Sequence, residues 1–140
     1  MESTETITAL YRESTAGDEP DGAFVQQLLD ALERDEEVLF SCGWPDNGEK
    51  WGPIAQLTVT SRRILDQRTI GAGVSAPIRA IARADIDEAI DRERAAVPMF
   101  TTRALLVRLA DGREIVWEYL TNHQIGPAAE AIAAALERRA

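Results

Sequence analysis

The fold class is decided by residues 57–65, which read Leu57-Thr58-Val59-Thr60-Ser61-Arg62-Arg63-Ile64-Leu65. Leu57 and Val59 alternate with threonines, which is the period of two expected for a strand that buries one face. Ser61-Arg62 then forms a short turn, and a second strand starts at Arg63. The stretch therefore predicts an antiparallel hairpin.

The same alternation continues on both sides of this hairpin. We expect strands at about residues 38–44, 51–60, 63–69, 75–81, 87–94, 101–109 and 113–120. Asp111-Gly112, between the last two strands, is the strongest hairpin turn signal in the chain. Many short strands separated by turn residues predict an antiparallel barrel or sandwich.

Helical patterns flank the strands at both ends of the chain. Asp21 is a good N-cap for a helix at about 22–34, with the apolar face Phe24, Val25, Leu28, Leu29 and Leu32. Gly126-Pro127 predicts the start of a final helix, with the apolar stripe Ile125, Ala129, Ile132, Ala133 and Leu136. We therefore expect a mostly loose tail over 1–20, with room for one helical turn around Ile7, Leu10 and Tyr11, then a helix over 21–35, and the strands with the final helix over 36–140.

The order of these elements resembles the PH-like superfamily, in particular the bacterial PH and GRAM-type domains. The resemblance rests on Glu36-Glu37-Val38-Leu39, the hairpin at 57–65, the region from Pro77-Ile78 to Asp87, and Asp111-Gly112-Arg113. It implies an α+β fold: a PH-like barrel of about seven antiparallel strands, capped by the C-terminal helix, with the N-terminal helix added in front. It also implies a binding role and no particular ligand.

The charge of the chain argues against several partners. Its formal net charge is −9, which disfavours nucleic acid and anionic membranes, because both are bound mainly by Lys and Arg. PH domains gather basic residues between the first two strands, where this chain has Lys50 beside Asp46 and Glu49. No apolar run is long enough for a membrane span, and no signal peptide is visible. We therefore expect a cytoplasmic protein without nucleic-acid binding or strong binding to anionic membranes.

The residues that most often carry catalysis have no visible partners. His123, the only histidine, falls in a predicted polar loop. Cys42 shares a predicted strand face with Phe40 and Trp44, which favours a buried thiol over a nucleophile. We therefore expect no enzyme and no cofactor.

The metal and phosphate motifs are also incomplete. The acidic group Asp85, Asp87, Glu88 and Asp91 lacks the spacing of a calcium loop. Gly71-Ala72-Gly73 lacks the helix and the lysine of a phosphate loop. The basic residues Arg62, Arg63 and Arg68 are candidates for a small anion site, although a hairpin turn is the simpler interpretation of the first two.

Two apolar segments remain as candidate protein interfaces. Trp44 and Trp51 bracket one predicted loop, and Val97, Met99 and Phe100 lie in another. Exposed aromatic side chains anchor interfaces. Packing against the N-terminal helix is the favoured interpretation for the two tryptophans, and it explains the second segment equally well.

We therefore expect a non-catalytic binding or adaptor module that acts through a protein partner or through self-association. One alternative is a lipid or membrane-surface module. Another is an acidic inhibitor or immunity-type protein that covers a basic partner, which requires the acidic residues to gather on one face.

Overall fold

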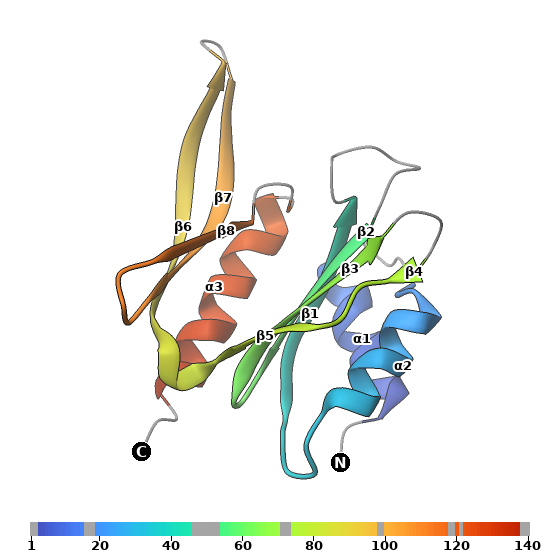
Figure 1. Ribbon diagram of the computed structural model, residues 1–140. Coiled ribbons are helices and arrows are strands. Elements are labelled where there is room, and N and C mark those ends of the chain that lie inside the picture. Colours follow the sequence, from blue (N-terminus) through green and yellow to red (C-terminus); the bar gives the residue numbers. More distant parts are fainter. Residues whose placement is uncertain are drawn as a thin grey trace.

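The computed structural model is an α+β fold with three helices and two antiparallel sheets in the part of the chain that it describes (Figure 1). The described residues are 3–15, 19–45, 54–70, 74–97, 100–117, 120 and 122–137. The helices are α1 (Thr4–Ser14), α2 (Gly22–Ala31) and α3 (Asn122–Glu137), with a short 3-10 helix, η1 (Arg83–Asp85). The strands are β1 (Val38–Pro45), β2 (Ile54–Thr60), β3 (Arg63–Ile70), β4 (Val74–Ser75), β5 (Arg79–Ala82), β6 (Ile86–Val97), β7 (Phe100–Leu109) and β8 (Glu114–Trp117).

The first sheet grows from the hairpin predicted at 57–65. Its order is β1-β2-β3-β4, and β5 pairs with the same edge of β3 as β4. The second sheet has the order β6-β7-β8. Its β7–β8 turn lies at Asp111-Gly112 as predicted, and Gly112 has a φ of 90°, which glycine adopts at little cost. The far end of the β6–β7 hairpin extends beyond the rest of the molecule (Figure 1).

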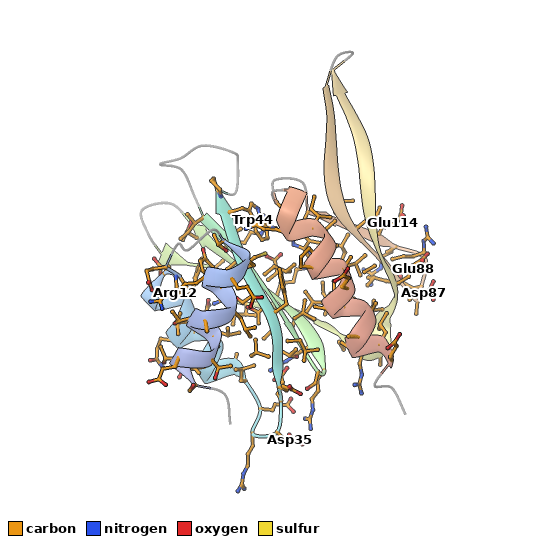
Figure 2. All side chains as sticks on the ribbon, turned by 180° about the vertical axis from the view of Figure 1, so that it is seen from behind. Arg12, Asp35, Trp44, Asp87, Glu88 and Glu114 are labelled. Atoms are coloured by element: carbon orange, nitrogen blue, oxygen red, sulfur yellow. The ribbon has the colours of Figure 1, made fainter. Side chains whose placement is uncertain are left out.

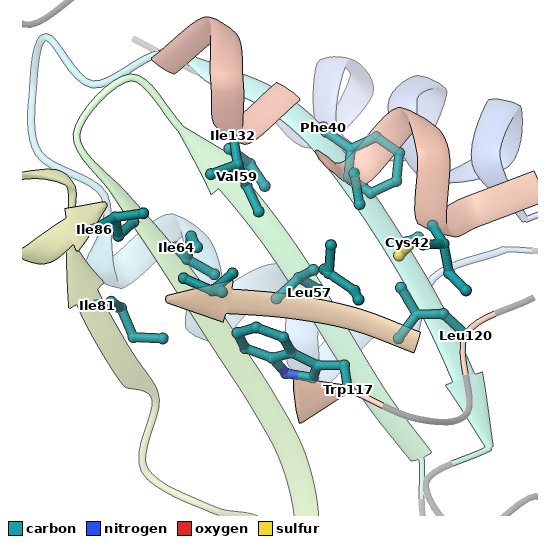
Figure 3. Close-up of a cluster of buried hydrophobic side chains, with 14 of the residues drawn as sticks. Phe40, Cys42, Leu57, Val59, Ile64, Ile81, Ile86, Trp117, Leu120 and Ile132 are labelled. Carbon is teal, nitrogen blue, oxygen red and sulfur yellow. The ribbon is translucent and has the colours of Figure 1, made fainter. Parts of the chain in front are cut away.

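The main apolar core lies between the first sheet, the second sheet and α3. Leu57 and Ile64 of the first sheet meet Trp117 of the second sheet, and Ile132 of α3 closes the core (Figure 3). Ile125 of α3 belongs to the same core. Each of these side chains is at most 2% exposed. Burial of this size stabilises a fold by about 1.5–3 kcal/mol per large aliphatic side chain.

The opposite face of the first sheet is covered by α1 and α2 (Figure 1) and is largely polar. Ser41 and Thr58 are partners across β1 and β2, and their hydroxyl groups lie 3.1 Å apart. Gln56 donates to the Ser41 hydroxyl, and Gln67 donates to the backbone carbonyl of Phe24 in α2. Hydrogen bonds as well as apolar contacts therefore hold this N-terminal layer on the sheet.

The expected closed barrel of about seven strands is not confirmed. The strands form two separate sheets, and no closed barrel is formed by the described residues. The chain leaves the first sheet at β5, passes through η1 and starts the second sheet with β6, while α3 packs between the two sheets (Figure 1). The predicted α+β class and the final helix are confirmed.

Two expected boundaries change. Residues 1–20 were expected to form a loose tail, whereas Thr4–Ser14 form α1, because Ser3 caps its first turn and Ile7 is fully buried. The final helix starts at Asn122 instead of Gly126, so Pro127 lies inside it. Burial of Gln124 and Ile125 outweighs the Gly-Pro start signal. The Asp21 cap of α2 is confirmed, since its side chain accepts from the amides of Ala23 and Phe24.

Candidate functional site

An open groove of about 420 Å³ lies between α1, β1 and α3. The lining residues are Leu10, Glu13 and Ser14 of α1, Leu39 and Phe40 of β1, and Pro127, Glu130 and Ala131 of α3. Both helices contribute residues at positions i, i+3 and i+4, which lie on one helical face. The groove therefore has two helical walls and an apolar floor.

Two contacts with strand β1 hold the α1 wall on the sheet. The Ser14 hydroxyl donates to the backbone carbonyl of Ser41 in β1. Tyr11, one turn earlier on the helix, lies against Gly43, another β1 residue on this face. A side chain at position 43 would collide with the Tyr11 ring, so glycine allows α1 to approach the strand closely.

The α3 wall is fixed to the same strand. Gln124, which is 1% exposed, donates from Nε2 to the backbone carbonyl of Gly43 over 3.0 Å. Ala128 and Ile132 of the same helix are buried in the main core. Both walls are therefore attached to β1 around one residue, Gly43.

Each wall carries one exposed carboxylate, Glu13 on α1 and Glu130 on α3. Neither forms a salt bridge with a basic side chain in the part of the chain that the structure describes. Several other charged side chains around the first sheet are paired, since Arg62 pairs with Glu33 and Asp35, and Arg12 pairs with Glu19. The groove thus combines an apolar floor with two negative charges that no described basic side chain pairs.

The negative charge of the chain is concentrated in the N-terminal layer. Residues 1–37 contain 11 acidic residues and only Arg12 and Arg34 as bases, a net charge of −9, which equals that of the whole chain. The other 103 residues hold 13 acidic and 13 basic residues and balance. The excess of acids therefore belongs to the segment that forms α1 and α2, although Glu33, Asp35 and Glu36 of this segment pair with Arg62 and Arg63 of the β2–β3 hairpin.

Trp44 is not an exposed interface residue. It is 5% exposed and belongs to the main core, on the sheet face opposite α1 and α2. The expected alternation of β1 is correct, because Phe40 and Cys42 share this core face. Packing under the N-terminal helix, the other interpretation, is also incorrect for Trp44. Figure 2 shows it at the end of β1.

The structure describes only some of the other apolar candidates. Trp51 and Met99 fall outside the described residues. Val97 and Phe100 are backbone partners at the end of the β6–β7 hairpin. Neither residue belongs to the described lining of the groove, and the role of this segment as an interface stays a prediction.

The three arginines do not converge on one free anion site. Arg62 and Arg63 both occupy the β2–β3 hairpin, where Arg63 pairs with the buried Glu36. Arg68 lies five residues farther along β3 and contacts Asp66, with 3.2 Å between Nε and Oδ1. Each guanidinium already has a carboxylate partner.

Cys42 and His123, the residues considered for catalysis, lie in a core strand and in a helix. Burial raises the pKa of the Cys42 thiol far above its ordinary value, so Cys42 is a core residue and not a nucleophile. His123 lies in the first turn of α3 and not in a loop. Gly71-Ala72-Gly73 falls outside the described residues.

The acidic group considered for metal binding is spread along η1 and β6. Glu88 forms a salt bridge with Arg108 of β7, which also contacts Glu114 of β8. Figure 2 shows Asp87, Glu88 and Glu114 together on the second sheet. Among the described residues, no group of three or more His, Cys, Asp or Glu side chains could hold a metal ion.

Sequence reasoning missed the groove because its residues come from three distant segments. Leu10 and Glu13 lie in the segment expected to be a loose tail, and Pro127 and Glu130 lie in the C-terminal helix that was expected to cap a barrel. The signal that was available is the i, i+3 pattern of Ile7, Leu10 and Glu13-Ser14, which indicates a helix with one packed face.

No described helix is long and apolar enough to cross a membrane. Comparison of the sequence with known protein families and with curated proteins gave no match.

Proposed function

We propose that the protein is a non-catalytic binding module that holds a segment of a partner protein in the groove between α1, β1 and α3. The observation that supports this most directly is the groove itself, with its apolar floor of Leu39 and Phe40 and an exposed Glu on each wall. Small-molecule sites usually bury 70–90% or more of their ligand. An open groove with exposed walls is better suited to a protein segment.

We keep a relationship to the PH-like superfamily as part of the proposal. The order of the strands and the final helix support it, although the strands form two separate sheets and not one barrel. A fold does not determine a function, so the binding role rests on the groove and not on the resemblance.

Site-specific photocrosslinking tests the proposal. A benzophenone amino acid replaces Pro127, which is exposed in the groove, or Ala133, which is exposed on another face of α3. Irradiation of the native host's extract should join a defined protein to position 127 and not to position 133. Equal capture from both positions, or capture of the protein's own copies alone, contradicts the proposal.

A second candidate is the acidic inhibitor or immunity-type protein. It is favoured by the gathering of the whole net charge in residues 1–37. The binding surface of such an inhibitor would extend beyond the groove over the acidic N-terminal layer. Neutralising the exposed acids Glu5, Asp30 and Glu33, which do not line the groove, should then weaken partner capture as much as changes in the groove.

A further inference from the structure

We infer that the partner segment in this groove is a cationic amphipathic helix, whose apolar side covers Leu39 and Phe40 and whose Lys or Arg residues lie near Glu13 and Glu130. This inference rests on the proposed function and specifies the class of partner. It follows from the arrangement of the walls, their charge and the openness of the groove.

The arrangement of the walls favours a helix. α1 presents Leu10, Glu13 and Ser14, and α3 presents Pro127, Glu130 and Ala131, so each wall offers one ridge of an i, i+3, i+4 face. Ridges of this kind pack against the grooves of another helix. An amphipathic helix placed in an apolar groove is also a common mode of peptide recognition.

The charge of the walls favours a basic partner. Glu13 and Glu130 have no basic partner among the described side chains, and the layer that contains Glu13 carries the net charge of the chain. A neutral or acidic helix would bring its own charges or dipoles close to these carboxylates without compensation. A helix with a basic residue on each side of its apolar face would pair with both walls.

The size of the groove limits the apolar contribution. A volume of about 420 Å³ has room for a few side chains, and Leu10, Leu39 and Ala131 are only half-buried without a partner. Covering them gives the helix its apolar binding energy. The exposed charge pairs add little affinity each but direct the encounter, so salt should act mainly on the association rate.

The experiment uses a fluorescein-labelled synthetic peptide, a short helix of Leu, Ala and Lys with one apolar face bordered by lysines. A scrambled peptide of the same composition has no apolar face, and a third peptide has Glu in place of Lys. Binding to the full chain is followed by fluorescence anisotropy at about 0.05 M and about 0.5 M salt, where charges are weakly and strongly screened.

Matched protein variants separate the groove from general acidity. The groove variant is Glu13→Gln with Glu130→Gln, and the control is Glu5→Gln with Glu137→Gln. Both remove the same charge from the same two helices, and Glu5 and Glu137 are exposed outside the groove. We expect the groove variant to bind the amphipathic peptide about fivefold more weakly at low salt. The control should change binding by less than about twofold.

Three results would overturn the inference: no saturable binding, equal binding of the scrambled peptide, or equal weakening in both variants. The proposed function fails separately. If position 127 crosslinks a partner segment that has no basic residues, the binding module stands and the cationic helix is wrong. If position 127 crosslinks no partner, the binding module is wrong even where the peptide binds.

Discussion

Arg63 donates two hydrogen bonds to Glu36, from Nε to Oε2 and from Nη2 to Oε1, and both are 2.8 Å long. The Glu36 side chain is fully buried, and that of Arg63 is 21% exposed. Thr60 donates to the same carboxylate, and Arg63 donates to the backbone carbonyl of Ala31 at the end of α2. The pair therefore joins the α2–β1 connection to the β2–β3 hairpin, and it helps to hold the N-terminal layer on the sheet.

Removing one member of this pair should be costly. Glu36→Ala leaves the Arg63 guanidinium without its buried partner, so we expect a loss of about 3–5 kcal/mol in the free energy of unfolding, measured with urea. The control is Asp35→Asn, because Asp35 is 72% exposed in its pair with Arg62 and should contribute at most about 1 kcal/mol. Similar losses for both variants would show that burial does not set the strength of the Glu36 pair.

The pKa values of two buried carboxyl groups, Glu36 and Asp66, should be shifted in opposite directions. Although burial opposes ionisation, the hydrogen bonds from Arg63 and Thr60 to Glu36 lower its pKa. At Asp66, burial outweighs the attraction of Arg68 and raises the pKa. Trp117 of β8 lies close enough to favour the ionised Asp66, although its indole N–H completes no hydrogen bond within the described part of the chain.

These directions determine how each group changes stability with pH. Glu36 stabilises the fold above the ordinary glutamate pKa of 4.5, and this contribution is lost as the pH falls through its lower native pKa. Asp66 binds a proton more tightly in the folded state, so its contribution is present below 3.8 and is lost as the pH rises through its native pKa.

Carbon-13 NMR titration of the two carboxyl carbons tests this directly. We expect an Asp66 midpoint above 3.8 and a Glu36 midpoint below 4.5. Asp66→Asn should also be at least as stable as the natural protein at neutral pH, since it removes a buried charge. A clear loss of stability in Asp66→Asn at neutral pH would show that the contact with Arg68 outweighs burial.

The sequence predicts most strands because apolar side chains alternate with polar or small ones, even in β1 and β2, which are buried on both faces. Alternation of Phe40, Cys42 and Trp44 correctly placed these residues on one side of β1, and Asp111-Gly112 correctly placed the β7–β8 turn. Such local patterns do not determine whether sheets close. The predicted single strand at 75–81 is in fact β4 and β5, separated by Ala76–Ile78.

The site was less accessible to sequence reasoning than the fold. The polarity of 1–20 favours a loose tail, but α1 rests on a sheet face that is itself largely polar, so it needs few apolar residues. Ile7 is the only large apolar side chain of α1 that is fully buried there. In the same way, the position of Trp44 beside Pro45 indicated a side chain at a loop, either exposed or packed against the N-terminal helix, whereas Trp44 lies within β1 and faces the main core.

Trp44→Ala should test that correction through stability. The side chain is 5% exposed in the main core, so its removal leaves a cavity and should cost about 3–5 kcal/mol. Val116→Ala is the control, because Val116 is 41% exposed and should cost less than about 1 kcal/mol. Both are measured by urea denaturation. If Trp44→Ala weakens partner capture while its urea midpoint stays unchanged, Trp44 belongs to an interface after all.

Gly43 sets the distance between the strand and the α1 wall of the groove. A Cβ atom at this position would lie 2.8 Å from two ring carbons of Tyr11, so Gly43→Ala requires the ring or the helix to move. Replacing glycine in a strand by alanine otherwise stabilises it by roughly 0.5–1 kcal/mol. We therefore expect Gly43→Ala to destabilise the protein instead, and to speed hydrogen exchange of the α1 amides more than that of the β2 and β3 amides.

A double-mutant cycle identifies the cause of this effect. In the Tyr11→Ala background the ring is absent, so Gly43→Ala should no longer destabilise the protein or further speed exchange in α1. The two substitutions should therefore couple, as neighbours in contact do, by about 0.5–3 kcal/mol. Gly43 also accepts the Gln124 hydrogen bond that holds α3, through its backbone carbonyl, which alanine retains. Exchange in α3 should accordingly change little. Additive effects, or equal loosening of α1 and α3, would mean that the Tyr11 contact does not position the groove wall.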